Sequence, residues 1–207
     1  MNNLLNKGAI LLISGPSGCG KSSLLNKLYN EIDNYYFSIS TTTRAPRLGE
    51  TDGVEYFFTT KEQFEEDIQK DNFLEWAEVH GNYYGTSLIP IKQALKENKL
   101  VIFDIDVQGF EQVIQKFKDI TTTVFITTPS LKELKLRLYN RATDNEKIIQ
   151  HRLENARKEI EYIDKYDYLL INNHLETAAK QLIAIAKVAK IKSSLFNKQN
   201  IIKQWLT

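Results

Sequence analysis

The chain has 207 residues, of which 42% are hydrophobic and 26% are charged, so it is long enough for one sizeable globular domain with a buried core. Its 27 basic and 26 acidic residues leave a net charge of +1, which excludes a broad electrostatic surface for nucleic acid or an anionic membrane. A single cysteine excludes an internal disulfide and a multi-cysteine zinc site, and no apolar run approaches the roughly 18 residues of a membrane span. A cytoplasmic location is therefore expected.

The first predicted element is a buried parallel strand at residues 9–13, where a continuous apolar run ends at Ser14. An amphipathic helix is predicted after Lys21, because leucines at 24, 25 and 28 share one helical face. Between strand and helix, the segment GPSGCGKS fits the pattern G-x-x-x-x-G-K-[ST]. Glycines in this pattern let backbone amides approach a phosphate closely, so the segment predicts a nucleoside triphosphate site.

Residues of this loop have separate predicted roles. Lys21 supplies positive charge to the outer phosphates, the hydroxyl of Ser22 is placed to bind Mg²⁺, and Cys19 contributes its backbone rather than its thiol. A glycine-rich turn that fits by chance is the alternative, and the flanking strand and helix argue against it. The residues expected to bind the triphosphate, which the family resemblance described below implies to be ATP, are Gly15, Pro16, Ser17, Gly18, Cys19, Gly20, Lys21, Ser22 and Ser23.

The next stretch, from about 36 to 86, is richer in threonine, aromatic residues and turn signals. Thr60 and Gln63 resemble a capping box for a short helix that runs through Ile68. Residues 73–79 alternate like a half-buried strand and precede a Gly81-Asn82 turn. These patterns predict an antiparallel insert that faces the phosphate loop.

After the insert, short apolar strands again alternate with amphipathic helices, which predicts an α/β fold with a parallel sheet covered on both faces. A charged helical stretch is expected at 141–164. The other expected helices are near 88–97, 109–117 and 130–140 and from about 175, and the expected strands are 100–106, 123–126 and 168–171.

Two arginines flank a proline in the insert, at Arg44 and Arg47, and Tyr56 follows a short way on. Guanidinium groups bind a dianionic phosphate through strong, charge-assisted hydrogen bonds, and a tyrosine hydroxyl adds a donor. A pair of solvated surface arginines is the alternative for this segment in isolation.

A second group consists of Glu75, Tyr84 and Thr86, followed by Asp104 and Asp106. Guanine presents two adjacent donors and one acceptor, so the Glu75 carboxylate and the Thr86 hydroxyl form a minimal complementary set. Asp104 ends the strongest apolar strand, where ligands bind in open parallel sheets, and can hold Mg²⁺ through a water or position an acceptor nucleotide. Alternatively, Glu75 points outward from its strand and Asp104 is structural.

The third group is basic. Arg137 and Arg141 are four residues apart and share one helical face, and Arg152 lies on the following helix. Arginines delivered by a closing lid stabilise the charge that develops during phosphoryl transfer and exclude water.

Five ordered motifs between about residues 8 and 190 resemble those of the guanylate kinase family. They are GPSGCGKSSL, SISTTTRAPRLGETDGVEYFF, FLEWAEVHGNYYGT, FDIDVQG and LRLYNRATDNEKIIQHRL. The resemblance implies phosphorylation of GMP to GDP by ATP with Mg²⁺. It also implies one three-layer αβα P-loop domain, with a core at about 8–35, 88–140 and 165–207, a mixed or antiparallel GMP-binding insert at 36–87 and a helical lid at 141–164.

The resemblance also assigns roles to residues at matching positions. Asn172 matches an asparagine near the adenine pocket. The implied catalytic residues are Lys21, Arg137, Arg141 and Arg152, and the implied GMP-binding residues are Ser40, Arg44, Arg47, Tyr56, Glu75, Tyr84, Thr86, Asp104 and Asp106.

Small departures from the family pattern are present. Thr86 stands where serine is frequent and keeps the hydroxyl, and Ala142 stands where glycine is frequent, which predicts a stiffer entry to the lid. Residues 191–207 extend past the usual pattern and carry apolar residues suited to docking on the protein itself or on a partner.

Two other functions remain open alternatives. One is a non-catalytic protein-binding module with this fold, although such modules typically have eroded phosphate loops. The other is a P-loop GTPase, although no segment fits the N-K-x-D type of guanine motif.

Overall fold

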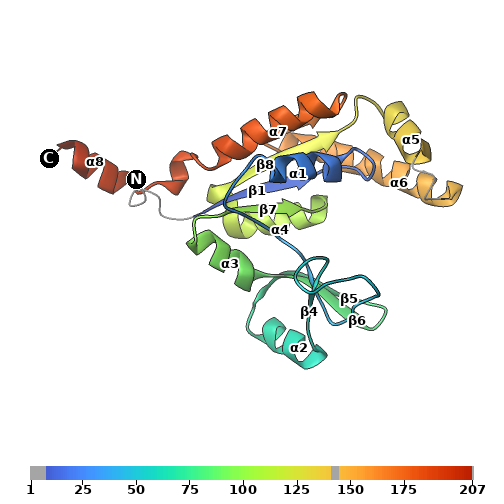
Figure 1. The fold of residues 1–207 in the computed structure, drawn as a ribbon, viewed down its shortest axis with the longest axis horizontal. Coiled ribbons are helices and arrows are strands. Elements are labelled where there is room, and N and C mark those ends of the chain that lie inside the picture. Colours follow the sequence, from blue (N-terminus) through green and yellow to red (C-terminus); the bar gives the residue numbers. More distant parts are fainter. Residues whose placement is uncertain (1–7, 141–144, 207) are drawn as a thin grey trace.

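The computed structural model describes residues 8–140 and 145–206, and its centre is a five-stranded parallel sheet in the order β2-β7-β1-β8-β9 (Figure 1). The central strand is fully buried between helices, which explains its unbroken apolar sequence. The strand bounds are β1 Ala9–Ser14, β2 Tyr35–Phe37, β7 Leu100–Asp104, β8 Thr121–Thr127 and β9 Tyr168–Ile171.

Helices cover both faces of this sheet, so the expected three-layer α/β architecture is confirmed. Helices α1 (Lys21–Tyr29) and α7 (Leu175–Ala189) pack together on one face, and α3 (Leu88–Lys96) and α4 (Val107–Phe117) lie on the other (Figure 1). Buried leucines at 24, 25 and 28 make the predicted apolar face of α1. None of the helices in the described parts of the chain is long and apolar enough to cross a membrane.

A smaller mixed sheet, in the order β4-β3-β6-β5, lies beside the core together with α2 (Lys61–Gln69) (Figure 1). Its strand bounds are β3 Thr41–Thr42, β4 Phe57–Phe58, β5 Phe73–Val79 and β6 Asn82–Ser87. The buried ring of Phe64 stacks on Phe73 at 4.1 Å between ring centroids and fastens α2 to this sheet. The predicted cap is confirmed, because the Gln63 amide donates to Thr60 Oγ1 at 3.2 Å.

Three details differ from the sequence-based expectations. β2 belongs to the core sheet although residues from about 36 were expected in the insert, because Tyr36 and Phe37 pair with β7. The alternation predicted for 73–79 is wrong: Phe73 and Leu74 are both buried while residues 76–79 are exposed, and a register shift lies between Phe73 and Trp76. β7 ends at Asp104 rather than at 106, because Asp106 caps α4.

The remaining elements are mostly in the second half of the chain, and all but one of them follow β8. They are α5 (Leu131–Asn140), α6 (Glu146–Glu159), α8 (Lys198–Leu206) and three short 3₁₀ turns at Lys118–Ile120, Ile160–Lys165 and Ser193–Leu195. Helix α8 projects from the end of the core that lies away from α5 and α6, and its Trp205 is 86% exposed (Figure 1).

Candidate functional site

The glycine-rich loop joins β1 to α1 at the carboxyl edge of the core sheet. Gly15 and Gly20 have φ angles of +146° and +96°, which favour glycine. A side chain would also collide with the surroundings: a Cβ at Gly15 would lie 1.9 Å from the Ile126 carbonyl oxygen, and one at Gly20 would lie 2.4 Å from Asn172 Nδ2. The pattern seen in the sequence is therefore required by backbone conformation and by close packing behind the loop.

Lys21 lies at the start of α1 and folds back over this loop. Its Nζ donates to the Gly15 carbonyl oxygen at 2.6 Å and lies 4.0 Å from Asp104 Oδ1. Burial raises the pKa of Asp104, and the positive charge of Lys21 only partly offsets that effect. The structure thus brings together an ammonium group and an incompletely solvated carboxylate at the ends of β1 and β7.

Asn172 supports the loop from behind. It is 4% exposed and its Nδ2 donates to the Cys19 carbonyl oxygen at 2.8 Å. The Cys19 thiol is buried as well, and burial raises its pKa, so the thiol is disfavoured as a nucleophile. From the other side, Arg152 of α6 donates through Nη1 to Ser17 Oγ at 2.8 Å.

A cavity of about 440 Å³ opens beside the loop, where α1, α5 and the segment after β9 meet. Arg137 reaches it from α5 while its Nε pairs with Glu133 Oε1 at 2.8 Å on the same helix. The lining residues are Gly18, Gly20, Ser23, Arg137, Asn140, Asn172, Asn173 and Leu175. Arg141, which the sequence places on the same face as Arg137, lies outside the described residues.

In the smaller sheet, Glu75 and Thr86 are brought together as expected. Antiparallel pairing of Trp76 with Gly85 sets their strands side by side, and the Thr86 hydroxyl donates to Glu75 Oε1 at 2.5 Å. Thr86 is buried, and Ser40 lies just before β3 in the same sheet. A carboxylate and a hydroxyl thus lie within one hydrogen bond of each other.

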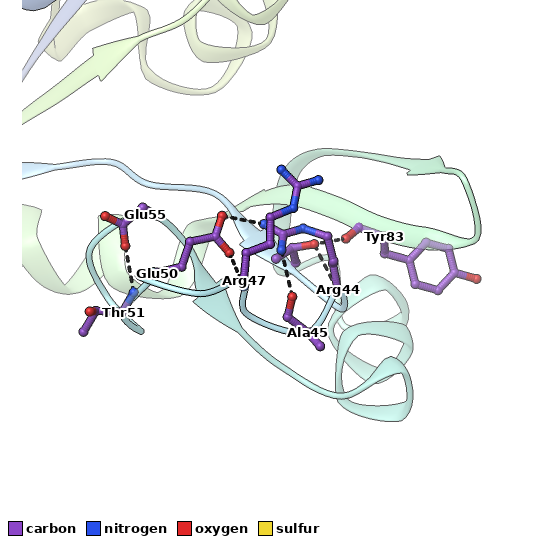
Figure 2. Close-up of polar contacts among 8 residues, drawn as sticks. Arg44, Ala45, Arg47, Glu50, Thr51, Glu55 and Tyr83 are labelled. Carbon is purple, nitrogen blue, oxygen red and sulfur yellow. Dashed lines mark hydrogen bonds and ion pairs between the residues drawn. The ribbon is translucent and has the colours of Figure 1, made fainter.

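The predicted arginine pair lies in the loop between β3 and β4, shown in Figure 2. The Arg44 guanidinium lies 5.5 Å from the ring centroid of Tyr56 and pairs with Glu50 through Nη2 and Oε1 at 2.9 Å. Tyr56 in turn contacts Tyr84 edge to face at 6.0 Å between centroids. These contacts join four residues into one cluster with Arg44 at its centre; the other three are Glu50, Tyr56 and Tyr84.

Asp106 has a structural contact that the sequence did not predict. Its Oδ1 accepts hydrogen bonds from the Gln108 and Gly109 amides at 3.0 and 2.9 Å, so it caps α4. This bonding orients the carboxylate at the carboxyl edge of the sheet, next to the end of β7.

Sequence reasoning missed several neighbours of these groups. Glu50 follows Arg47 by three residues, a spacing at which a side chain can accept from a backbone amide across a turn, so the contact could have been predicted. Asn173 adjoins the predicted Asn172, but no local pattern indicated Asn140 or Leu175. Glu159, at the end of α6, is half-buried. Burial raises its pKa, and the positive charge of Lys21 partly offsets that effect. No sequence pattern indicated this interaction, because α6 lies far along the chain from the phosphate loop.

The phosphate loop, with Lys21 folded over it at the edge of a parallel sheet, defines a P-loop nucleotide-binding protein. Comparisons with known proteins identify the group more closely. The chain belongs to the guanylate kinase family, whose family model matches residues 7–188.

Individual relatives are similar over nearly the whole chain. Guanylate kinase of Sulfurimonas denitrificans is 50% identical over 198 residues, which cover 96% of each chain. Guanylate kinase of Helicobacter hepaticus is 50% identical over 201 residues, covering 97% of this chain and all of the relative. A crystal structure of guanylate kinase from Anaplasma phagocytophilum superposes with a TM-score of 0.70 at 28% identity, covering 96% of this chain and 95% of that one.

Proposed function

We propose that this protein transfers the γ-phosphoryl group of ATP to GMP and forms ADP and GDP, a step of purine nucleotide metabolism. One observation carries the proposal: the chain holds both a phosphate loop with Lys21 and, in a separate sheet, a Glu75–Thr86 pair joined at 2.5 Å. The first suits a nucleoside triphosphate and the second suits a guanine base. The names of the relatives support the same reaction.

ATP binds with its phosphates on the amides of residues 15–23 and its nucleoside in the cavity beside the loop. Amide side chains and Leu175 line that cavity, which is a suitable mixture for a purine ring and a ribose. The hydrogen bond from Asn172 to the Cys19 carbonyl suggests that Asn172 acts by supporting the loop as well as by lining the cavity.

Magnesium is the expected metal ion. Among the described residues no group of three or more His, Cys, Asp or Glu side chains is placed to hold a metal, so the ATP phosphates would provide most of the ligands. The Ser22 hydroxyl would be an additional oxygen ligand. Asp104, a poorly solvated carboxylate near Lys21, would hold a water molecule bound to the ion. When bound, the ion neutralises charge on the phosphates.

GMP binds to the smaller sheet. Glu75 accepts from the base N1–H and N2 amine, the Thr86 hydroxyl turns its single proton from Glu75 to O6 as the base binds, and Ser40 and Asp106 complete the guanine contacts. Arg44, Arg47, Tyr56 and Tyr84 hold the phosphate. Adenine would place an acceptor against the Glu75 carboxylate, and such a buried mismatch is costly.

The transfer is in line and direct. An oxygen of the GMP phosphate forms a bond to the γ-phosphorus as the bond to the β–γ bridging oxygen breaks, and ADP leaves with that electron pair. No general base is needed because the attacking oxygen is already anionic. Lys21, Arg137 and Arg152, with Arg141, stabilise the charge on the transferring group.

Two segments complete the site by moving toward the core. The insert at about 36–87 carries GMP, and the lid at about 141–164 carries Arg152, whose bond to Ser17 suggests how the lid meets the loop. Closure would exclude water, which otherwise competes with GMP for the phosphoryl group.

A coupled assay of ADP formation with ATP and a panel of nucleoside monophosphates tests the proposal. Turnover with GMP and not with AMP, CMP or UMP is expected. Absence of turnover with retained binding of peptides would indicate a non-catalytic module instead. Hydrolysis of GTP without an acceptor would indicate a GTPase.

A further inference from the structure

We propose that Glu50 is a positioning residue that holds Arg44 and the backbone of Arg47 in the arrangement in which both arginines receive the acceptor phosphate. The inference rests on the proposed function and adds to it a residue that touches neither substrate. It concerns the part of the loop between β3 and β4 that Figure 2 shows.

Glu50 is attached to both arginines at once. Its Oε1 accepts from Arg44 Nη2 at 2.9 Å, its Oε2 accepts from the Arg47 amide at 2.7 Å, and its own amide donates to the Arg47 carbonyl oxygen at 3.0 Å (Figure 2). The side chains of Arg44 and Glu50 are only 15% and 17% exposed. Glu50 is therefore held by three hydrogen bonds, two through its carboxylate and one through its backbone amide, and it closes the turn around the arginines.

These contacts leave donors available for a phosphate. A guanidinium has five N–H donors, of which Arg44 directs Nη2 to Glu50 and Nη1 to the Ala45 carbonyl at 2.7 Å. Arg47 contacts the Glu50 carboxylate through its backbone amide and not through its side chain. Figure 2 shows the Arg47 guanidinium directed away from Glu50. An arriving phosphate would add to this arrangement instead of displacing the carboxylate.

Charge gives Glu50 a second effect on the same residues. Two neighbouring guanidinium groups repel each other when no phosphate lies between them. The Glu50 carboxylate, which lies in the same backbone turn, offsets that repulsion. The hydrogen bond from Arg44 lowers the pKa of Glu50, so the carboxylate stays ionised near neutral pH. Binding then costs less because the arginines are already ordered.

Other carboxylates tie the same loop to itself without touching Arg44. Glu55 Oε2 accepts from the Thr51 amide, and Asp52 Oδ1 accepts from the Phe58 amide, both at 2.8 Å. Glu55 is thus a matched control, because removing it loosens the loop and leaves the Glu50–Arg44 pair in place.

Calorimetric binding of two probes, GMP and guanosine, to the full chain without ATP tests the inference. Glu50→Ala is expected to weaken GMP binding by about tenfold or more and to leave guanosine binding unchanged, because only the phosphate contacts are affected. Glu50→Gln keeps one acceptor oxygen and turns an NH₂ group toward the other donor, so it should give a smaller loss of GMP binding than Glu50→Ala and also leave guanosine binding unchanged. In assays, KM for GMP should rise more than kcat falls.

Each of the following outcomes would overturn the inference. Tighter GMP binding by Glu50→Ala would show that the carboxylate competes with the phosphate. Equal losses for GMP and guanosine, or an equal loss in Glu55→Ala, would show a merely structural role. Unchanged GMP binding in all variants would refute the role of Glu50 and leave the proposed function intact. A wild-type chain that binds no GMP would refute both.

Discussion

The Thr86 hydroxyl of β6 donates a 2.5 Å hydrogen bond to Glu75 Oε1 on β5, the neighbouring edge strand of the smaller sheet. Glu75 lies inside the register shift between Phe73 and Trp76, and such irregularities redirect side chains. The pair is therefore ordered by the sheet before any base arrives, and such preorganisation favours the selective binding of guanine proposed above.

Changing Glu75 to glutamine should reduce kcat/KM for GMP by about 10- to 100-fold, because an amide presents a donor to the donors of the base. The ratio of GMP to AMP turnover should fall as well. Glu78→Gln is the matched control, since Glu78 is exposed on the same strand. Steady-state kinetics with both nucleotides would contradict the assignment if the two variants behaved alike.

Replacing Lys21 by methionine should lower kcat by about 100-fold or more and affect nucleotide affinity much less, because charge on the transferring group develops late. Lys27→Met is the control: Lys27 lies on the same helix and pairs with Glu176 at 2.7 Å on the surface. Pre-steady-state measurements separate chemistry from binding. An increase confined to KM for ATP would refute the proposed role.

Asp104→Asn should raise thermal stability near neutral pH and lower activity. Burial raises the pKa of Asp104, so ionisation costs the folded state stability at pH values above that raised pKa, and this cost vanishes below the ordinary value of about 4. The stability gain over wild type should thus be present at pH 7 and shrink as the pH falls toward 4. A gain independent of pH would show that another effect dominates.

Gly20→Ala should destabilise the protein by about 2–4 kcal/mol, and Gly49→Ala by only about 1–2 kcal/mol. Both glycines have left-handed φ angles, +96° and +89°, but a Cβ at Gly20 meets Asn172 Nδ2 at 2.4 Å whereas one at Gly49 meets nothing within 4 Å. The added cost is the broken hydrogen bond to Cys19. Urea denaturation of both variants measures the difference, and equal losses would indicate backbone strain alone.

Much of the fold was predictable because its signals are local. The apolar run before Gly15, the cap at Thr60 and the glycine-rich loop each depend on residues within one element or its immediate neighbours. The burial pattern of residues 73–79 was mispredicted because a bulge changes which side chains face inward, and alternation in the sequence cannot reveal a bulge.

The sequence by itself determined the phosphate loop, the parallel α/β core and the residue types for a guanine and a phosphate, since each is encoded at short spacing. Only the tertiary structure decided that β2 joins the core, that Asp106 caps α4 and that Glu50 closes the turn around Arg44. It also placed Asn172 against Cys19, 153 residues earlier in the chain. The pairing of β2 and the Asn172–Cys19 contact depend on how distant segments pack, which no local spacing records. The contacts of Asp106 and Glu50 span at most six residues, but the same spacings occur without such bonds, so the three-dimensional structure was needed to establish them.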